Sequence, residues 1–205
     1  REGGDGRTTF VPTLLRYGFA DKWEVRIEGN GYTWEMQVVS AENATDSHGL
    51  APTSIGLKYS FVEAVGSNQP SLGTIIRVFP PSGSGEFRNT RTTGDIRLAA
   101  DWESRQMILN PNVDIGLYQG DDRRTYAAGL FAATLNFNPS KVVNFLVDTG
   151  VQTPDEKHGR TSMIVDAGGA LVIGHDIQLD FSVGTGVAGS KPPHPFVAAG
   201  FSKRF

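Results

Sequence analysis

The four histidines are the first candidates for catalytic or metal-binding chemistry. His48, His158, His175 and His194 are far apart in the chain, fall in predicted loops or turns, and have no cysteine near them because the sequence contains none. A zinc site needs His, Cys or carboxylate ligands at short, regular spacings, and none of these histidines has such a partner. The sequence also lacks the Gly-x-Ser-x-Gly turn that presents a serine nucleophile. We therefore predict no catalytic residue, no metal site and no cofactor, and hence no enzyme.

Charged residues are the second candidates, and their balance limits what the protein binds. The formal net charge is −3, from 19 Lys and Arg against 22 Asp and Glu. Without a basic surface, nucleic acid is not predicted as a partner. The charges recur in segments whose apolar residues stand at every second position: in 23–29, WEVRIEG, three apolar residues alternate with three charged ones. Similar alternation returns at 55–61, 96–102 and 177–184.

This period of two predicts the elements that position the charges. Successive side chains of a β-strand point to opposite faces, and the 25 glycines and 11 prolines disfavour helices. We predict one all-β domain over residues 1–205, with about 11 visible antiparallel strands. The predicted strands cover 8–17, 23–36, 54–63, 72–80, 95–102, 107–118, 125–138, 142–154, 161–173, 177–187 and 194–205.

The connections between these strands alternate in length. One set is mostly tight, at 18–22, 103–106, 139–141 and 174–176, with 64–71 somewhat longer; the other is longer and more polar, at 37–53, 81–94, 119–124, 155–160 and 188–193. Short turns on one side and long loops on the other are typical of transmembrane β-barrels of the outer membrane. Because such barrels have an even number of strands, the odd count predicts that the first strand is missing and that the complete barrel has about 12.

Alternation alone fits both a soluble β-protein and a membrane barrel, which turn opposite faces inward. Three features favour the membrane barrel. Charges of both signs recur on nearly every strand, and aromatic residues such as Trp23, Trp102 and Tyr118 stand near strand ends, as an aromatic girdle requires. Glycines such as Gly56 and Gly184 on the charged face leave room for long side chains.

Residues on the charged face are therefore predicted to line a polar lumen. Their competing role is to form ion pairs across the barrel that only neutralise one another. The lumen-lining candidates are Glu24, Arg26, Glu28, Lys58, Arg77, Arg97, Asp101, Asp114, Asp148, Asp166 and Asp180. The end of the chain, with Phe201 and a terminal Phe205, resembles the signal read by the outer-membrane assembly machinery.

Four passages carry a resemblance to a known family. The sequence Pro12–Tyr32, with Ser54–Phe61, Asp114–Gln119 and Ile177–Phe205, resembles the bacterial family of outer-membrane transporters named for the meta-pathway of phenol degradation. The resemblance spans nearly the whole chain. It implies an outer-membrane β-barrel that passes small aromatic or other apolar metabolites. The segment 191–194, KPPH, departs from the acidic residue and Trp that often precede the last strand of such proteins.

The expected function is a passive outer-membrane channel for uptake or efflux of small molecules. Its expected partners are membrane lipid, the outer-membrane assembly machinery and a small-molecule solute. Two alternatives stay open on the sequence: a structural or adhesive barrel whose external loops bind a partner, and a soluble lipocalin-like carrier with its apolar face turned inward.

Overall fold

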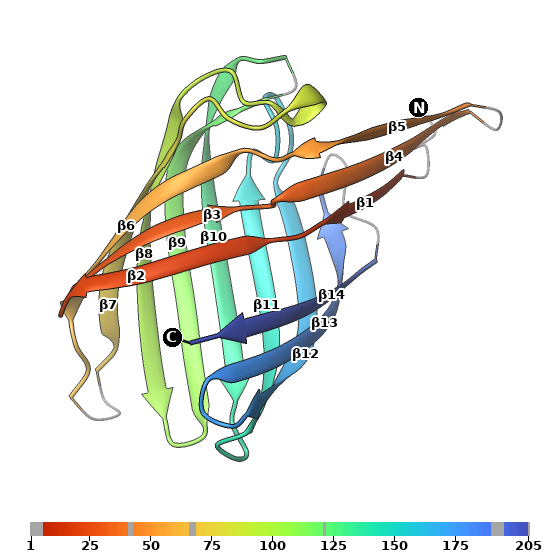
Figure 1. Ribbon diagram of the computed structural model, residues 1–205. Coiled ribbons are helices and arrows are strands. Elements are labelled where there is room, and N and C mark those ends of the chain that lie inside the picture. The colour runs from red at the N-terminus through yellow and green to blue at the C-terminus, as the bar shows by residue number, and fades with distance from the viewer. Residues whose placement is uncertain (1–5, 41–42, 66–68, 121, 190–194, 205) are drawn as a thin grey trace. The chain divides into compact units, whose positions relative to one another are not determined.

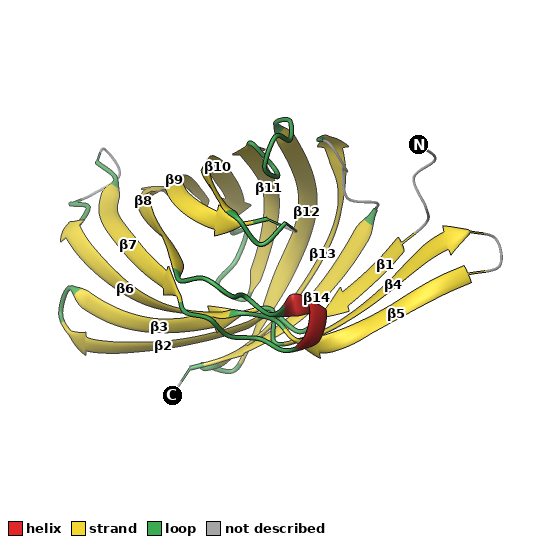
Figure 2. Ribbon diagram, turned by 90° about the horizontal axis from the view of Figure 1, so that it is seen from above, coloured by secondary structure: helices red, strands yellow, loops and turns green. Residues whose placement is uncertain are grey.

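Strands make up most of the protein in the computed structural model, which describes residues 6–40, 43–65, 69–120, 122–189 and 195–204. The only helical segment in these ranges is the 3₁₀ turn η1 (Gly85–Phe87), which is red in Figure 2. No helix among the described residues has the length and apolar character to cross a membrane. The strands are β1 (Gly6–Phe10), β2 (Thr13–Ala20), β3 (Trp23–Gly29), β4 (Tyr32–Ser40), β5 (Asn43–Leu50), β6 (Thr53–Val62), β7 (Ser71–Phe79), β8 (Thr93–Ser104), β9 (Met107–Gln119), β10 (Thr125–Phe137), β11 (Val143–Thr153), β12 (Ser162–Ile173), β13 (Ile177–Ala188) and β14 (Phe196–Lys203).

Eleven of these strands form one sheet, in the order β14-β13-β12-β11-β10-β9-β8-β7-β6-β3-β2 (Figure 1). They correspond one to one with the strands that the alternation predicts. The predicted strands 8–17 and 23–36 are each interrupted, the first at Pro12, which has no backbone N–H to donate, and the second at Gly31, whose φ is +56°. The pieces before and after these breaks, β1 and β4, join β5 in a separate three-stranded sheet.

The prediction of a loop over residues 37–53 is wrong. β4 continues to Ser40, and β5 pairs with it antiparallel, from Tyr32 opposite Leu50 to Ser40 opposite Asn43. The sequence of β5, NATDSHGL, has no apolar alternation, but strand pairing is made by backbone groups and needs only a partner. His48 consequently lies on a strand and not in a loop.

Of the other histidines, His158 and His175 lie in turns as predicted, and His194 lies outside the described residues.

The chain divides into two compact units. Unit 1 comprises 1–59, 75–95 and 117–125, and unit 2 comprises 60–74, 96–116 and 126–205. Most of the described strands in the main sheet pass through one unit only, whereas β6 to β10 each contribute residues to both.

The burial of side chains runs opposite to that of a soluble domain. On β13, Leu179, Phe181 and Val183 are 44%, 55% and 47% exposed, while the polar residues between them are half-buried. Among the described residues the buried hydrophobic side chains are only Ile75 and Ala128, and the buried polar ones include Asp95 and Asp114. A soluble lipocalin-like carrier needs its apolar face covered, so this exposure argues against that alternative.

A charge placed on the exposed apolar face tests this sense of burial. Val25 lies on β3 between Glu24 and Arg26, with its side chain on the apolar face. We expect Val25→Arg to lower the free energy of unfolding in lipid by about 2 to 4 kcal/mol, because a charge must then enter the hydrocarbon layer. Urea unfolding of the protein refolded into vesicles measures the change, and Val25→Ala is the control that removes bulk without adding charge. Equal stability of the Arg and Ala variants would show that this face does not contact lipid.

Candidate functional site

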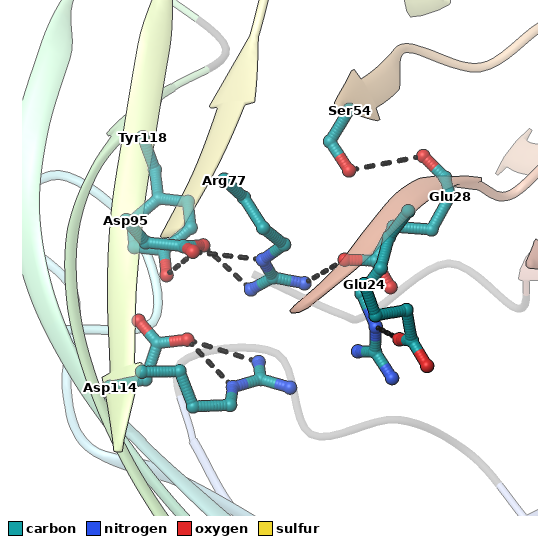
Figure 3. Close-up of polar contacts among 9 residues, drawn as sticks. Glu24, Glu28, Ser54, Arg77, Asp95, Asp114 and Tyr118 are labelled. Atoms are coloured by element: carbon teal, nitrogen blue, oxygen red, sulfur yellow. Dashed lines mark hydrogen bonds and ion pairs between the residues drawn. The ribbon is translucent and has the colours of Figure 1, made fainter. Parts of the chain in front are cut away.

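Arg77 on β7 is the centre of an ion-pair network in unit 1 (Figure 3). Its Nε donates to Asp95 Oδ1 at 2.8 Å and its Nη2 to Asp95 Oδ2 at 2.6 Å, so the contact with this carboxylate is bidentate. Its Nη1 donates to Glu28 Oε1 at 3.0 Å. Asp95 has no exposed side-chain surface, and the Tyr118 hydroxyl donates to its Oδ2 at 3.3 Å. Two carboxylates therefore share one guanidinium whose fork geometry fixes all three groups.

A glycine makes this network possible. β6 lies between β3 and β7 in the sheet, so Arg77 must cross β6 to reach Glu28 on β3. A Cβ added at Gly56 on β6 would stand 3.3 Å from Arg77 Cγ and 3.5 Å from Arg26 Cβ, so the Arg77 side chain would have to shift by a few tenths of an ångström. Beside it, the fully buried Ser54 donates to the backbone oxygen of Glu28 at 3.2 Å. The expectation that Gly56 leaves room for long side chains is confirmed.

Three further charged side chains lie on the same strands as this network, on β3 and β6. Arg26 donates from Nε to Glu24 Oε1 at 2.6 Å, two residues apart on the same face of β3. Lys58 on β6 stands directly opposite Glu24 in the antiparallel register. Glu24 is thus bound by Arg26 on its own strand and has Lys58 as its register partner on the neighbouring strand.

The loop between β7 and β8 is anchored at both ends by polar side chains of unit 1. Ser84 Oγ accepts from the backbone N–H of Leu50 at 2.8 Å, and Ser82 Oγ accepts from that of Thr53 at 3.1 Å. At the other end, Gln119 Oε1 accepts from Thr90 N, Thr90 Oγ1 and Arg91 N at 2.9, 3.1 and 3.1 Å. The loop is therefore held against the ends of β5, β6 and β9.

Unit 2 contains a second buried ion pair. Arg97 on β8 donates to Asp114 Oδ2 on β9, from Nε at 3.1 Å and from Nη2 at 3.0 Å. The side chain of Asp114 has no exposed surface. Removing either partner of such a pair leaves a buried charge uncompensated, which is costly.

A chain of hydrogen-bonded amides runs across four strands of unit 2. Asn110 donates from Nδ2 to Asp101 Oδ1 at 2.5 Å, and Asn136 donates to Asn110 Oδ1 at 2.7 Å. Asn144 then donates to Asn136 Oδ1 at 3.2 Å and to Asn138 Oδ1 at 2.8 Å. We call these five residues the amide ladder. A carboxylate can only accept hydrogen bonds, so Asn110 must turn its NH₂ group toward Asp101. The side-chain oxygen of Asn110 then accepts from the NH₂ group of Asn136, and the oxygen of Asn136 accepts from that of Asn144, so each amide orients the next.

Three carboxylates lie on the polar face of the next strands. Asp148 on β11 stands directly opposite Asp166 on β12, and Asp180 on β13 stands opposite Ala170 and Gly200. All three are half-buried. Within the described residues, no ion pair or side-chain hydrogen bond reaches them, and no three His, Asp or Glu side chains are placed to hold a metal ion together.

The structure places all 11 lumen-lining candidates on strands, on the face that carries polar side chains. The sequence-based prediction missed Asp95, at the predicted start of its strand, and the four asparagines of the amide ladder. A signal for these asparagines is present in the sequence. Asparagine is depleted in strands, and yet it recurs at every second position at Asn136 and Asn138. Tyr118 was predicted for an aromatic girdle, and this is wrong: its hydroxyl binds Asp95 on the polar face.

Of the two predicted signal residues, Phe201 is 64% exposed on β14 opposite Leu179, and Phe205 lies outside the described residues.

Residues 5–205 match the model of the family described as "Putative MetA-pathway of phenol degradation". The chain belongs to this family. No protein in the curated set matches the sequence at a significant level.

Three solved structures are similar to this member of the family. An outer membrane channel from Pseudomonas putida F1 aligns with a TM-score of 0.69 at 10% identity, covering 92% of this chain and 79% of that one. The NanC porin aligns with a TM-score of 0.62 at 9% identity, covering 98% and 97%. The CymD monoaromatic hydrocarbon channel aligns with a TM-score of 0.53 at 9% identity, covering 98% and 74%. The fold is the antiparallel β-barrel of outer-membrane proteins.

The buried network around Arg77 predicts a large effect of removing its charge. Arg77→Met leaves the fully covered Asp95 carboxylate without a cation, and we expect the free energy of unfolding to fall by about 3 to 5 kcal/mol. Urea unfolding in vesicles measures the fall. The added change Asp95→Asn removes the unpaired charge and is expected to restore part of the stability. If the Arg77→Met variant is as stable as the parent protein, the Arg77–Asp95 ion pair does not hold strands together.

Gly56 offers a second test of the same network. We expect Gly56→Val to displace Arg77 from Glu28 and to destabilise the protein by about 1 to 3 kcal/mol, as overpacking does elsewhere. Gly18→Val is the matched control, since a Cβ at Gly18 meets only the Trp23 oxygen, at 3.9 Å. If the two valine variants unfold at the same urea concentration, the space over Gly56 is not needed by Arg77.

Proposed function

We propose that the protein is a passive channel of the bacterial outer membrane for small molecules. The observation that carries the proposal is the sense of burial: apolar side chains are exposed on the strands, while the charged pairs Arg77–Asp95 and Arg97–Asp114 are covered. A barrel in lipid needs an apolar outer surface and can keep a polar interior. The membership of the family and the likeness to outer-membrane channels support the same function.

In this proposal the polar face of the strands lines the lumen. The candidates for contact with solute are the 11 charged residues predicted from the sequence, among which Arg77 and Arg97 are held in fixed positions by their carboxylates. Selection then depends on lumen width and on the pattern of fixed charges, and passage needs no energy coupling. No catalysis and no cofactor take part.

The proposed solutes are small aromatic or other apolar metabolites. The family is described by a pathway of phenol degradation, and CymD is described as a monoaromatic hydrocarbon channel. In this proposal the loop between β7 and β8, which side chains hold at both ends, restricts which molecules enter. Membrane lipid and the outer-membrane assembly machinery are the partners that the exposed apolar face and Phe201 are proposed to meet.

Planar bilayers test the channel directly. We expect the full protein to give discrete ionic conductance steps, and proteoliposomes containing it to take up a small labelled polar solute. A variant with residues 83–89 replaced by a short Gly-Ser link is expected to conduct more, because the anchored loop is lost.

Absence of both conductance and uptake would overturn the proposal. Unchanged flux in the shortened-loop variant, together with loss of binding to cells or matrix, would favour the alternative of an adhesive barrel that acts through its loops.

A further inference from the structure

The three-stranded sheet of β1, β4 and β5 has one covered and one exposed face. Thr33 on β4 and Gly49 on β5 are buried, and they stand opposite each other in the register. A Cβ added at Gly49 would meet side-chain atoms of the β7–β8 loop, so this loop lies over the covered face. Tyr32 and Trp34 point to the other face, where they are 38% and 48% exposed.

This exposed face continues the apolar face of β3. β4 runs on from the end of β3 (Figure 1), and both strands belong to unit 1. The exposed apolar side chains stand at odd positions on β3, as Val25 and Ile27 do, and at even positions on β4. The break at Gly31, where φ is +56°, shifts the alternation by one residue. The exposed surface therefore leads from β3 onto Tyr32 and Trp34.

The character of this surface changes along the strands. On β2, β3 and β6, two rows of residues paired across the strands carry only apolar and aromatic side chains: Tyr17–Val25–Leu57 and Leu15–Ile27–Ile55. On β1, β4 and β5 the corresponding rows are Thr9–Trp34–His48 and Arg7–Met36–Asp46. The surface thus passes from apolar through aromatic to charged side chains, which is the order met on leaving a hydrocarbon layer.

The length of the apolar stretch matches the thickness of that layer. Trp23 packs against Tyr59 at one end of β3, with ring centroids 4.5 Å apart. Nine residues lead from Trp23 to Tyr32, which is about 30 Å of extended chain. With the strand tilt of about 35–45° that outer-membrane barrels have, this is about 21–24 Å of depth, against an apolar band of about 25 Å. Tyr32 and Trp34 therefore stand at the boundary, on the side of the long connections, which is the outer side in such barrels.

Tyr32, Trp34 and His48 form one compact cluster at this boundary. The ring centroid of Tyr32 lies 4.5 Å from that of Trp34 and 6.3 Å from that of His48, and Trp34 stands directly opposite His48 in the register. All three side chains are exposed. One ring-sized group can contact all of them, with its face on an aromatic ring and its edge at the hydroxyl, indole N–H or imidazole.

The charges beside the cluster do not favour an ionic headgroup. On the described part of this face the formal charges are those of Arg7 and Asp46, one of each sign, on either side of Met36. Anionic phospholipids are held by clusters of Lys and Arg, which these residues do not form. A sugar ring has apolar C–H groups on its faces and hydroxyl groups at its rim, and aromatic rings with polar edges complement both.

We propose that Tyr32, Trp34 and His48 form a binding site for the saccharide headgroup of a glycolipid in the outer leaflet. A sugar ring stacks on the exposed rings of Tyr32 and Trp34, and its hydroxyl groups bond to His48. The hydrocarbon chains of the same lipid lie along the apolar rows of β2, β3 and β6. This inference goes beyond the proposed channel, because it concerns the surface that meets the membrane and does not depend on conduction.

Fluorescence quenching in vesicles tests the site. The full protein is refolded into phosphatidylcholine vesicles that contain a small fraction of spin-labelled lipid, with the label on the acyl chain close to the headgroup. The labelled lipid is digalactosyl diacylglycerol, phosphatidylcholine or phosphatidylglycerol. Trp23→Phe with Trp102→Phe leaves Trp34 as the single tryptophan. We expect the labelled glycolipid to be enriched about two- to tenfold beside Trp34, and hence to quench it more strongly than either labelled phospholipid.

A second protein with one tryptophan is the matched control. Trp34→Phe with Trp102→Phe keeps Trp23, at the other end of β3, where we expect the three labelled lipids to quench equally. In the Trp34 protein, Tyr32→Leu is expected to abolish the enrichment because the stacked ring is lost, and Tyr32→Phe is expected to retain it.

Three results would overturn the site: equal quenching of Trp34 by the glycolipid and by phosphatidylcholine, a preference for phosphatidylglycerol, or an enrichment that is the same at Trp23. The failure of the channel is distinct from these. Glycolipid enrichment without bilayer conductance would overturn the channel and leave the site, whereas conductance without enrichment would overturn the site and leave the channel.

Discussion

Arg77 joins strands that do not all pair with one another. Its guanidinium binds Asp95 on β8 through two hydrogen bonds and Glu28 on β3 through a third, and it reaches β3 only by passing over Gly56 on β6. Backbone hydrogen bonds link each strand to its neighbours alone. Arg77 therefore supplies a side-chain constraint over four strands, β3, β6, β7 and β8, and sets the positions of the carboxylates that flank it.

This constraint follows from the inverted burial of the protein. Among the described residues most large apolar side chains are exposed and only Ile75 and Ala128 are buried, so hydrophobic contacts do little to fix the geometry of the covered face and polar groups must do so. A covered carboxylate such as Asp95 or Asp114 is tolerable only with a cation in hydrogen-bond contact. Planar guanidinium groups meet this need better than ammonium groups, because they bind a carboxylate at two atoms. Among the described residues the fully covered carboxylates are those of Asp95 and Asp114, and both are accordingly paired with arginine.

The strands and the polar face could be predicted from the sequence because both follow from a period of two. Charged residues within an alternating segment, such as Glu24 or Asp180, must lie on the face opposite the apolar ones. The features that could not be predicted depend on which residues strand pairing brings together. β5 has no alternation of its own and is a strand because β4 lies beside it, and the Tyr118 hydroxyl binds Asp95 only through the register of β8 and β9. The amide ladder likewise joins residues 101, 110, 136 and 144, whose proximity no local pattern contains.

The two units differ in how far their polar faces are neutralised. In unit 1 the carboxylates of Glu28 and Asp95 are bound by Arg77, and Glu24 is bound by Arg26, so these charges are already engaged with one another. In unit 2 one pair, Arg97–Asp114, is engaged in the same way, while Asp148 and Asp180 face a cavity. Engaged charges gain little from a passing solute because binding it would break an existing pair, whereas charges without such a pair gain the full interaction. By this argument, in the proposed channel residues of the first kind fix its dimensions, and residues of the second kind decide which molecules stay in it longest.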